Sequence, residues 1–177
     1  MIVLIRKEVQ ALKYTLSVLV ENCPGVLSKV SGLFSRRAFN IDSLAVGVTQ
    51  DPTVSRITIV VNGDDATTEQ VEKQLNKLVD VIKVKTLPHG GYISRELILL
   101  KIACNVSNRG EIIQIADIFQ AKIIDVTHTT LTLEFSGIVS RIASLENMLQ
   151  PYGIREIVRT GTIALEKGPQ EILINKK

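Results

Sequence analysis

The stretch Tyr14-Thr-Leu-Ser-Val-Leu-Val-Glu-Asn-Cys-Pro-Gly-Val-Leu27 decides the fold, because it contains a strand, a sharp turn and the start of a helix. Apolar residues alternate with others along its first half, and this period of two predicts a β-strand. The turn residues Asn22-Cys-Pro-Gly25 break the pattern. From Val26 the apolar residues recur at helical spacing, and Pro24 suits a first helical turn, where no N–H donor is needed.

The chain continues this pattern into a complete βαββαβ unit. In order, the sequence predicts a strand at 41–49, a strand at 56–61, a helix with Val71, Leu75 and Leu78 on its apolar face, and a strand at 81–87. A unit of this kind forms a four-stranded antiparallel sheet with both helices on one face.

The second half repeats this order of elements without repeating the sequence. The expected elements are a strand at 96–103, a helix with Ile112, Ile115, Ala116 and Phe119 on one face, strands at 123–127 and 130–135, a helix with Ile138, Ile142, Leu145 and Leu149 on one face, and a strand at 155–163. Pro88-His-Gly-Gly91 interrupts the chain between the two halves. The expected fold class is therefore α+β, with two ferredoxin-like βαββαβ domains.

These patterns also divide the chain into segments. We expect an N-terminal extension over residues 1–13, a first domain over residues 14–87, a linker over residues 88–93, a second domain over residues 94–165 and a tail over residues 166–177.

The composition is that of an ordinary globular protein, with 45% apolar and 22% charged residues among 177. A net charge of +3 is too small and too scattered to indicate a nucleic-acid surface, and the strand at 56–61 has no aromatic residue to stack on bases. The five apolar residues at the N-terminus are too few for a membrane span, and their charges follow rather than precede them, unlike a secretory signal. We expect neither nucleic acid nor membrane as a partner. The expected location is a bacterial cytoplasm, or the plastid stroma if an organelle encodes the chain.

No set of residues has the spacing of a catalytic or metal site. The sequence contains neither a phosphate-binding glycine loop nor a serine nucleophile motif. An acylphosphatase-like phosphate site is disfavoured because the first strand–helix loop has no arginine. Cys23 and Cys104 fit no zinc motif and are expected to be free thiols, while His89 and His128 are expected to be solvated turn residues. We therefore expect no catalytic residue and no metal ligand on this chain.

The first strand–helix loop has the chemistry to bind an amino acid. Gly25 lets backbone approach a ligand, and the helix start exposes N–H groups that suit a carboxylate. Asn22, and Asn40 after the first helix, offer amide oxygens that can accept from an ammonium group. The same residues also suit an ordinary turn, with Asn22 capping the helix and Gly25 turning the chain. The residues alone leave both interpretations open.

Several stretches of the sequence, in order, resemble one protein family. Val20-Glu-Asn-Cys-Pro-Gly-Val-Leu27 resembles the opening of an ACT domain, a small amino-acid-sensing module. Longer stretches resemble the small regulatory subunit of acetolactate (acetohydroxyacid) synthase: Leu33-Phe-Ser-Arg-Arg-Ala-Phe-Asn-Ile-Asp-Ser-Leu44, Asp51-Pro-Thr-Val-Ser-Arg-Ile-Thr-Ile59, Gln74-Leu-Asn-Lys-Leu-Val-Asp-Val-Ile82, Ser94-Arg-Glu-Leu-Ile-Leu-Leu-Lys101 and Ile123-Ile-Asp-Val-Thr127. The resemblance runs from about Tyr14 to Leu165.

This resemblance implies a function, partners and a site. A member of the family is not catalytic by itself; it activates the large catalytic subunit and confers feedback inhibition by valine in branched-chain amino-acid biosynthesis. Thiamine diphosphate, Mg²⁺ and FAD are expected on the large subunit, and no cofactor is expected on this chain. Two ACT domains are expected to pair as a homodimer with valine at their interface. The matching effector residues are Asn22, Gly25, Val26 and Leu27 of one chain and Asn40 and Ile41 of the other.

Alternatives remain at three points. A free-standing ACT-type sensor for another amino acid shares the loop at 22–27 but leaves the resemblance of the second half unexplained. Valine and leucine differ by one methylene, worth about 1–3 kcal/mol, so both stay open as effectors. Ala38 stands where the family commonly has glycine. If the first helix ends there in the left-handed conformation, alanine costs about 1 kcal/mol; otherwise the cap is built differently.

Overall fold

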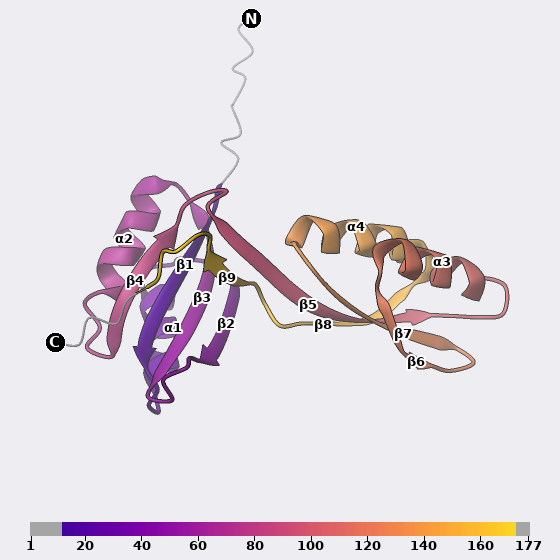
Figure 1. Ribbon diagram of the computed structural model, residues 1–177, viewed down its shortest axis with the longest axis horizontal. Helices are drawn as coiled ribbons and strands as arrows, with labels where there is room; N and C mark the ends of the chain where they lie inside the picture. Colours follow the sequence, from indigo (N-terminus) through magenta and orange to yellow (C-terminus); the bar gives the residue numbers. More distant parts are fainter. Residues whose placement is uncertain (1–11, 173–177) are drawn as a thin grey trace, which may run out of the picture. The chain divides into compact units, whose positions relative to one another are not determined.

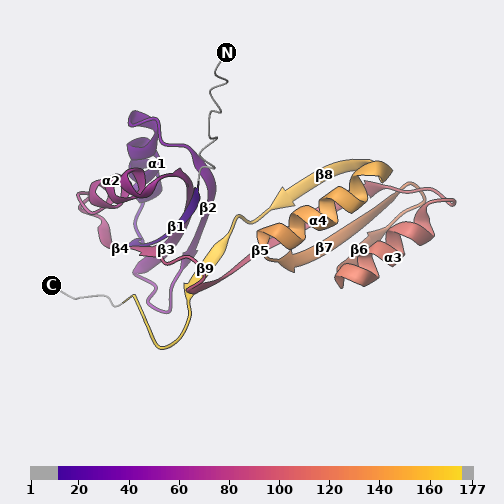
Figure 2. The same cartoon turned by 90° about the horizontal axis from the view of Figure 1, so that it is seen from above.

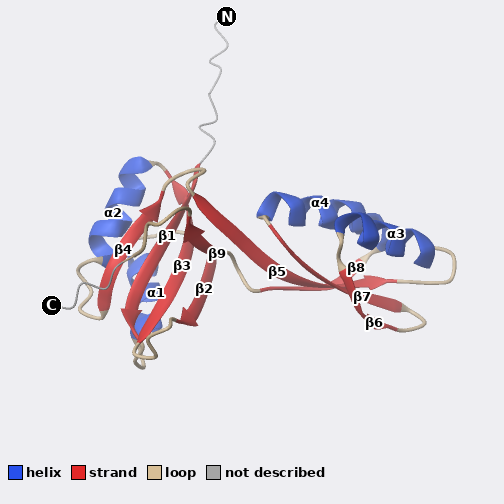
Figure 3. Cartoon of the chain, in the orientation of Figure 1, coloured by secondary structure: helices blue, strands red, loops and turns tan. Residues whose placement is uncertain are grey.

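The computed structural model describes residues 12–172 and divides the chain into two compact units. Of the described residues, one unit comprises residues 12–91 and 168–172, and the other comprises Tyr92–Lys167. Each unit has its own antiparallel sheet with two α-helices (Figures 1 and 3). None of the helices in the described part of the chain has the length and apolar character needed to cross a membrane. Most of the expected N-terminal extension and the end of the expected tail lie outside the described residues.

The first unit confirms the expected βαββαβ order. Its elements are β1 (Leu12–Glu21), α1 (Val26–Arg36), β2 (Ile41–Val48), β3 (Val54–Gly63), α2 (Asp65–Leu75) and β4 (Val81–Leu87). The strands lie in the order β2-β3-β1-β4, and all neighbours are antiparallel. Strand β2 is therefore at one edge of the sheet, and β1 is in its centre.

The core of the first unit lies between the sheet and its two helices, which cover the same face (Figure 2). In the β1–β3 register, Leu16 lies opposite Ile59 and Val18 lies opposite Ile57, and all four are buried. Burying each such side chain contributes about 1.5–3 kcal/mol to the free energy of unfolding. The helices supply the other side of this core with Val26, Val30, Leu33, Phe34, Val71 and Leu75.

The second unit repeats the architecture. Its elements are β5 (Tyr92–Ala103), α3 (Arg109–Phe119), β6 (Lys122–Val126), β7 (Thr130–Gly137), α4 (Val139–Leu149), a 3-10 turn η1 (Gln150–Tyr152), β8 (Ile154–Arg159) and β9 (Ile163–Glu166). The sheet order β6-β7-β5-β8 is equivalent to that of the first unit, and β9 pairs with the start of β5. The core under α3 and α4 includes Ile98, Leu100, Ile102, Leu131 and Leu133. The α+β class with two βαββαβ units is therefore confirmed, with β9 as an addition.

The predicted strand at 155–163 is instead two strands, β8 and β9. Thr160 interrupts the ladder: its backbone N–H donates to the carbonyl of Leu97, and its Oγ1 accepts from the Leu97 N–H, both at 3.1 Å. Gly161 follows with a φ of +77°, a left-handed conformation that favours glycine. The Thr160 hydroxyl thus takes the place of a backbone carbonyl as the acceptor for Leu97, between the end of β8 and the start of β9.

Two predicted helix boundaries were also wrong. Helix α2 ends at Leu75, before Leu78, where the backbone changes to i→i−3 hydrogen bonds: the Lys77 N–H donates to the Gln74 carbonyl at 3.2 Å, and the Leu78 N–H donates to the Leu75 carbonyl at 3.0 Å. Leu78 still packs against the core from the following turn. Helix α4 begins at Val139, so Ile138 lies at its N-cap and is 47% exposed rather than on the buried face.

Helix α1 ends in a Schellman motif centred on Ala38. The Phe39 N–H donates to the Phe34 carbonyl at 3.1 Å, and the Ala38 N–H donates to the Ser35 carbonyl at 3.2 Å. The rings of Phe34 and Phe39 meet edge-on at 6.3 Å, which supplies the apolar contact typical of the motif. Ala38 has a φ of +56°, so the helix ends there in the left-handed conformation.

Replacing Ala38 with glycine is expected to raise the free energy of unfolding by about 1 kcal/mol, because glycine adopts this φ without steric cost. Thermal and denaturant unfolding of the Ala38→Gly variant measure the change. The matched control is Ala143→Gly in the exposed interior of α4, where the same substitution should lower stability by about 1 kcal/mol. A destabilised Ala38→Gly variant would contradict the assignment of strain to this position.

Candidate functional site

The N-terminus of α1 presents free backbone donors. Gly25 precedes the helix with a φ of +89°, and no side chain caps this end. The first helical hydrogen bond runs from the Lys29 N–H to the Gly25 carbonyl at 3.0 Å, which leaves the N–H groups of Val26, Leu27 and Ser28 without a helical partner. A Cβ placed on Gly25 would meet no heavy atom within 4 Å, so the space beside Gly25 is open. Free N–H groups and the helix dipole favour an anion here.

Asn22 does not cap this helix, and its side chain is bonded to the turn between β2 and β3. The Nδ2 group donates to the Pro52 carbonyl at 2.9 Å, and the Oδ1 atom accepts from the Ser55 hydroxyl at 3.1 Å. The Asn22 backbone N–H donates to the Thr53 carbonyl at 2.7 Å. The capping interpretation of Asn22 is therefore wrong, while the turn interpretation of Gly25 is correct.

Pro52 and Ser55 were not predicted as site residues. The contact between Asn22 and Pro52 spans 30 positions of the chain, and no local pattern reveals it. Both residues belong to the Asp51–Ile59 stretch that carries part of the family resemblance. The family resemblance of that stretch could have drawn attention to Pro52 and Ser55, but it did not indicate that they contact the first loop.

The aliphatic residues of the loop differ in exposure. Val26 is buried in the core of the first unit, whereas Leu27 is 45% exposed at the open end of α1. The Leu27 side chain can therefore contact an aliphatic side chain of a ligand. The Val26 side chain cannot, but the Val26 backbone N–H can donate to a ligand.

Asn40 and Ile41 lie at the opposite end of the sheet from Asn22. Ile41 begins β2 and lies opposite Val61, whereas Val48 ends β2 and lies opposite Ser55, the partner of Asn22. Seven residue steps along β2 separate these ends, about 23 Å at the usual rise. A single chain therefore does not bring Asn40 and Ile41 next to the loop from Asn22 to Leu27.

Asn40 is exposed, and a cluster of polar side chains holds it at the start of β2. Its Nδ2 group donates to Asp42 Oδ1 at 3.2 Å. Asp42 also accepts from Asn62 Nδ2 at 2.8 Å and pairs with Lys13 Nζ at 2.9 Å. Within residues 12–172, one N–H and the amide oxygen of Asn40 make no hydrogen bond, so both are available to a ligand.

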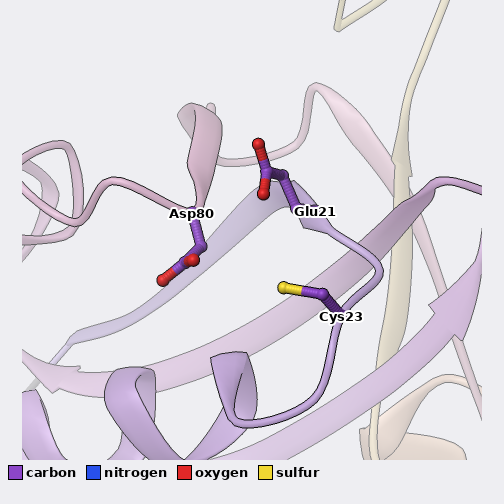
Figure 4. Close-up of side chains that lie close together, drawn as sticks. All are labelled: Glu21, Cys23 and Asp80. Atoms are coloured by element: carbon purple, nitrogen blue, oxygen red, sulfur yellow. The ribbon is translucent and has the colours of Figure 1, made fainter.

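Within residues 12–172, Glu21, Cys23 and Asp80 are the one set whose side chains are close enough together to share a metal ion (Figure 4). Their potential ligand atoms all lie within 4.8 Å of one another. Lys29 Nζ already bonds Asp80 Oδ2 at 2.6 Å, so the chain supplies its own cation to this acidic group. The hydrogen bond to Asp80 raises the pKa of Lys29 and keeps the ammonium protonated.

The cysteines and histidines occupy separate places in the described structure. Cys23 and Cys104 are both free thiols, the first exposed and the second buried. The His89 ring meets Tyr14 edge-on at 5.2 Å, and His128 is exposed in the turn between β6 and β7.

Comparisons with known proteins identify the family. Residues 16–83 match a family model described as an AHAS small subunit-like ACT domain, and residues 95–168 match one described as the small subunit of acetolactate synthase. The acetolactate synthase small subunit of Mycolicibacterium smegmatis is 48% identical over 159 residues, which cover 90% of this chain and 94% of the relative. A probable acetolactate synthase small subunit of Archaeoglobus fulgidus is 45% identical over 89% of this chain and 98% of its own length.

A solved structure agrees with these sequence matches. The crystal structure of the acetolactate synthase small subunit from Thermotoga maritima superposes with a TM-score of 0.83 and 40% identity. The superposition covers 89% of this chain and 98% of that chain. With its two family models, its curated relatives and its fold in agreement, the chain belongs to the family of acetolactate synthase small subunits.

Proposed function

We propose that this chain is the regulatory subunit of acetolactate synthase, which activates the large catalytic subunit and makes it sensitive to valine. The observation that carries the proposal is the first loop, where unpaired helix N–H groups adjoin an asparagine amide with spare hydrogen-bonding capacity. The names of the relatives, which are small subunits of this enzyme, support the same role. In this proposal thiamine diphosphate, Mg²⁺ and FAD belong to the large subunit.

The loop is suited to both charged ends of an α-amino acid. The N–H groups of Val26 to Ser28 can donate to a carboxylate at the positive end of the α1 dipole. The Asn22 amide uses one N–H and one oxygen lone pair on the β2–β3 turn, so one of each remains. The remaining lone pair can accept from an ammonium group. A zwitterion thus finds complementary partners at both ends.

The second half of the site comes from a second copy in this proposal. Strand β2 is an open edge, with Val46 48% and Val48 59% exposed. If two copies pair antiparallel along this edge, the Ile41 end of one β2 lies beside the Val48 end of the other. Asn40 and Ile41 of one chain then adjoin the loop from Asn22 to Leu27 of its partner. Ile41 and Leu27 would enclose the aliphatic side chain of valine.

Regulation follows by linkage. Valine inhibits if it binds more tightly to the inactive arrangement of the complex than to the active one, and coupling of this kind is typically about 1–3 kcal/mol. An effector site built from two chains is sensitive to how those chains are arranged. A change in the pairing of the two ACT domains would therefore alter valine affinity and the activity of the bound large subunit together.

Acetolactate formation by the cognate large subunit, with and without this chain and across a valine titration, tests the proposal. We expect the chain to raise activity and valine to reverse that increase. The Asn40→Ala variant should raise the valine concentration needed for half-maximal inhibition by about 10–100-fold, because hydrogen bonds to charged groups contribute about 1.5–3 kcal/mol. Each curve is normalised to the same complex without valine. Failure of the unaltered chain to raise activity would instead indicate a free-standing amino-acid sensor.

Mixed dimers test whether each site draws on two chains. Asn22→Ala and Asn40→Ala homodimers should each bind valine weakly, whereas a mixed dimer of the two has one site with both asparagines intact. By calorimetry, we expect the mixed dimer to bind one valine tightly, half the number bound by the unaltered dimer. The control pairs the Asn22→Ala chain with an Asn22→Ala, Asn40→Ala chain, which leaves no intact site. Equal binding by the test and control mixtures would show that the two asparagines do not cooperate across chains.

A further inference from the structure

Ser55 is the buried neighbour of Asn22. It lies near the start of β3, opposite Val20 of the central strand and Val48 of the edge strand, and it is only 6% exposed. Its hydroxyl forms a hydrogen bond with Asn22 Oδ1 at 3.1 Å. The buried Ser55 hydroxyl thus contacts a side chain that is itself a candidate ligand-binding group.

The chemistry of Pro52 determines which atom of the Asn22 amide faces Ser55. A carbonyl oxygen only accepts, so the amide group within 2.9 Å of the Pro52 oxygen must be the NH₂ donor. The Oδ1 atom therefore faces Ser55, and the serine hydroxyl must be the donor. These two contacts at opposite sides of the amide fix both its plane and its orientation.

Several hydrogen bonds hold the β2–β3 turn, which carries Pro52 and leads into Ser55. Asp51 Oδ1 accepts from the Thr53 backbone N–H at 2.9 Å and from the Thr53 hydroxyl at 2.6 Å. The Val54 N–H donates to the Asp51 carbonyl at 2.9 Å, and the Thr49 hydroxyl bonds the Val54 carbonyl at 3.1 Å. The Pro52 carbonyl is thus presented from a closed network rather than from a loose loop.

We propose that Ser55 is a positioning residue for the effector site: its hydroxyl orients the Asn22 amide so that one lone pair and one N–H face the bound amino acid. This inference rests on the proposed function. Without the hydroxyl, the Asn22 amide loses one of its two fixed contacts, and it can rotate about the bond that joins it to Cβ. Part of the free energy of effector binding is then spent on ordering the amide.

Calorimetric titration of valine into the full-length chain tests the inference. We expect Ser55→Ala to bind valine about fivefold to tenfold more weakly, the usual effect of one lost hydrogen bond. Ser55→Thr retains the hydroxyl and should bind within about twofold of the unaltered chain. Thr68→Val is the matched control: it removes another buried hydroxyl, bonded to the Asp64 carbonyl at 3.0 Å in α2, and should leave valine affinity unchanged.

A double-mutant cycle separates positioning from a general structural effect. If Ser55 acts through Asn22, adding Ser55→Ala to Asn22→Ala should weaken valine binding no further. A side-chain amide NMR signal assigned to Asn22 should also broaden or shift in Ser55→Ala but not in Thr68→Val. Additive losses in the cycle, or an unshifted valine affinity in Ser55→Ala, would overturn the positioning role alone. No binding of valine, leucine or isoleucine by the unaltered chain would overturn the proposed function and this inference with it.

Discussion

The pairing of β1 with β3 positions the first loop of the first unit. Leu16 faces Ile59 in this register, and a slip by one residue would turn the apolar rows of both strands away from the helices. The same register sets Glu21 opposite Val54, so the chain leaves β1 beside the β2–β3 turn. The bonds of Asn22 to that turn are therefore a consequence of core packing. The amide is held in place by the hydrophobic core as much as by its own hydrogen bonds.

The sequence predicted the elements that depend on local periodicity. Strand β4 runs from Val81 to Leu87 as predicted, because apolar spacing alone determines which faces must be buried. Helix α1 begins at Val26, where the helical spacing starts, but Pro24 precedes the N-cap Gly25 and does not lie in the first helical turn as expected. The errors arose at the ends of elements, where the apolar pattern continues past the last regular hydrogen bond. Thr160 divides the last predicted strand, and α2 ends in bonds from Lys77 to Gln74 and from Leu78 to Leu75. Apolar spacing does not predict these bonds, because they depend on local geometry and not on which face is buried.

For the site, the sequence provided the components but not their arrangement. The free N–H groups after Gly25 follow from a local turn, and local patterns can predict them. The contacts of Asn22 with Pro52 and Ser55 join residues from different strands, so they required the folded chain. The separation of Asn22 from Asn40 likewise became clear only from the strand order, which sets them at opposite ends of one sheet. The residues were predictable because their chemistry is distinctive, whereas their distances depend on topology.

The open edge of β2 has a cost when the chain is alone. Edge strands of soluble proteins are usually protected by lysine, proline or a strong bulge, which discourage pairing with a stray strand. Strand β2, Ile41-Asp-Ser-Leu-Ala-Val-Gly-Val48, contains no lysine or proline, and its bulge lies at the Ile41 end. Its second half exposes valine side chains beside unpaired backbone groups. A chain produced without a matching strand is thus prone to aggregate through this edge, so the timing of its synthesis and assembly bears on its solubility in the cell.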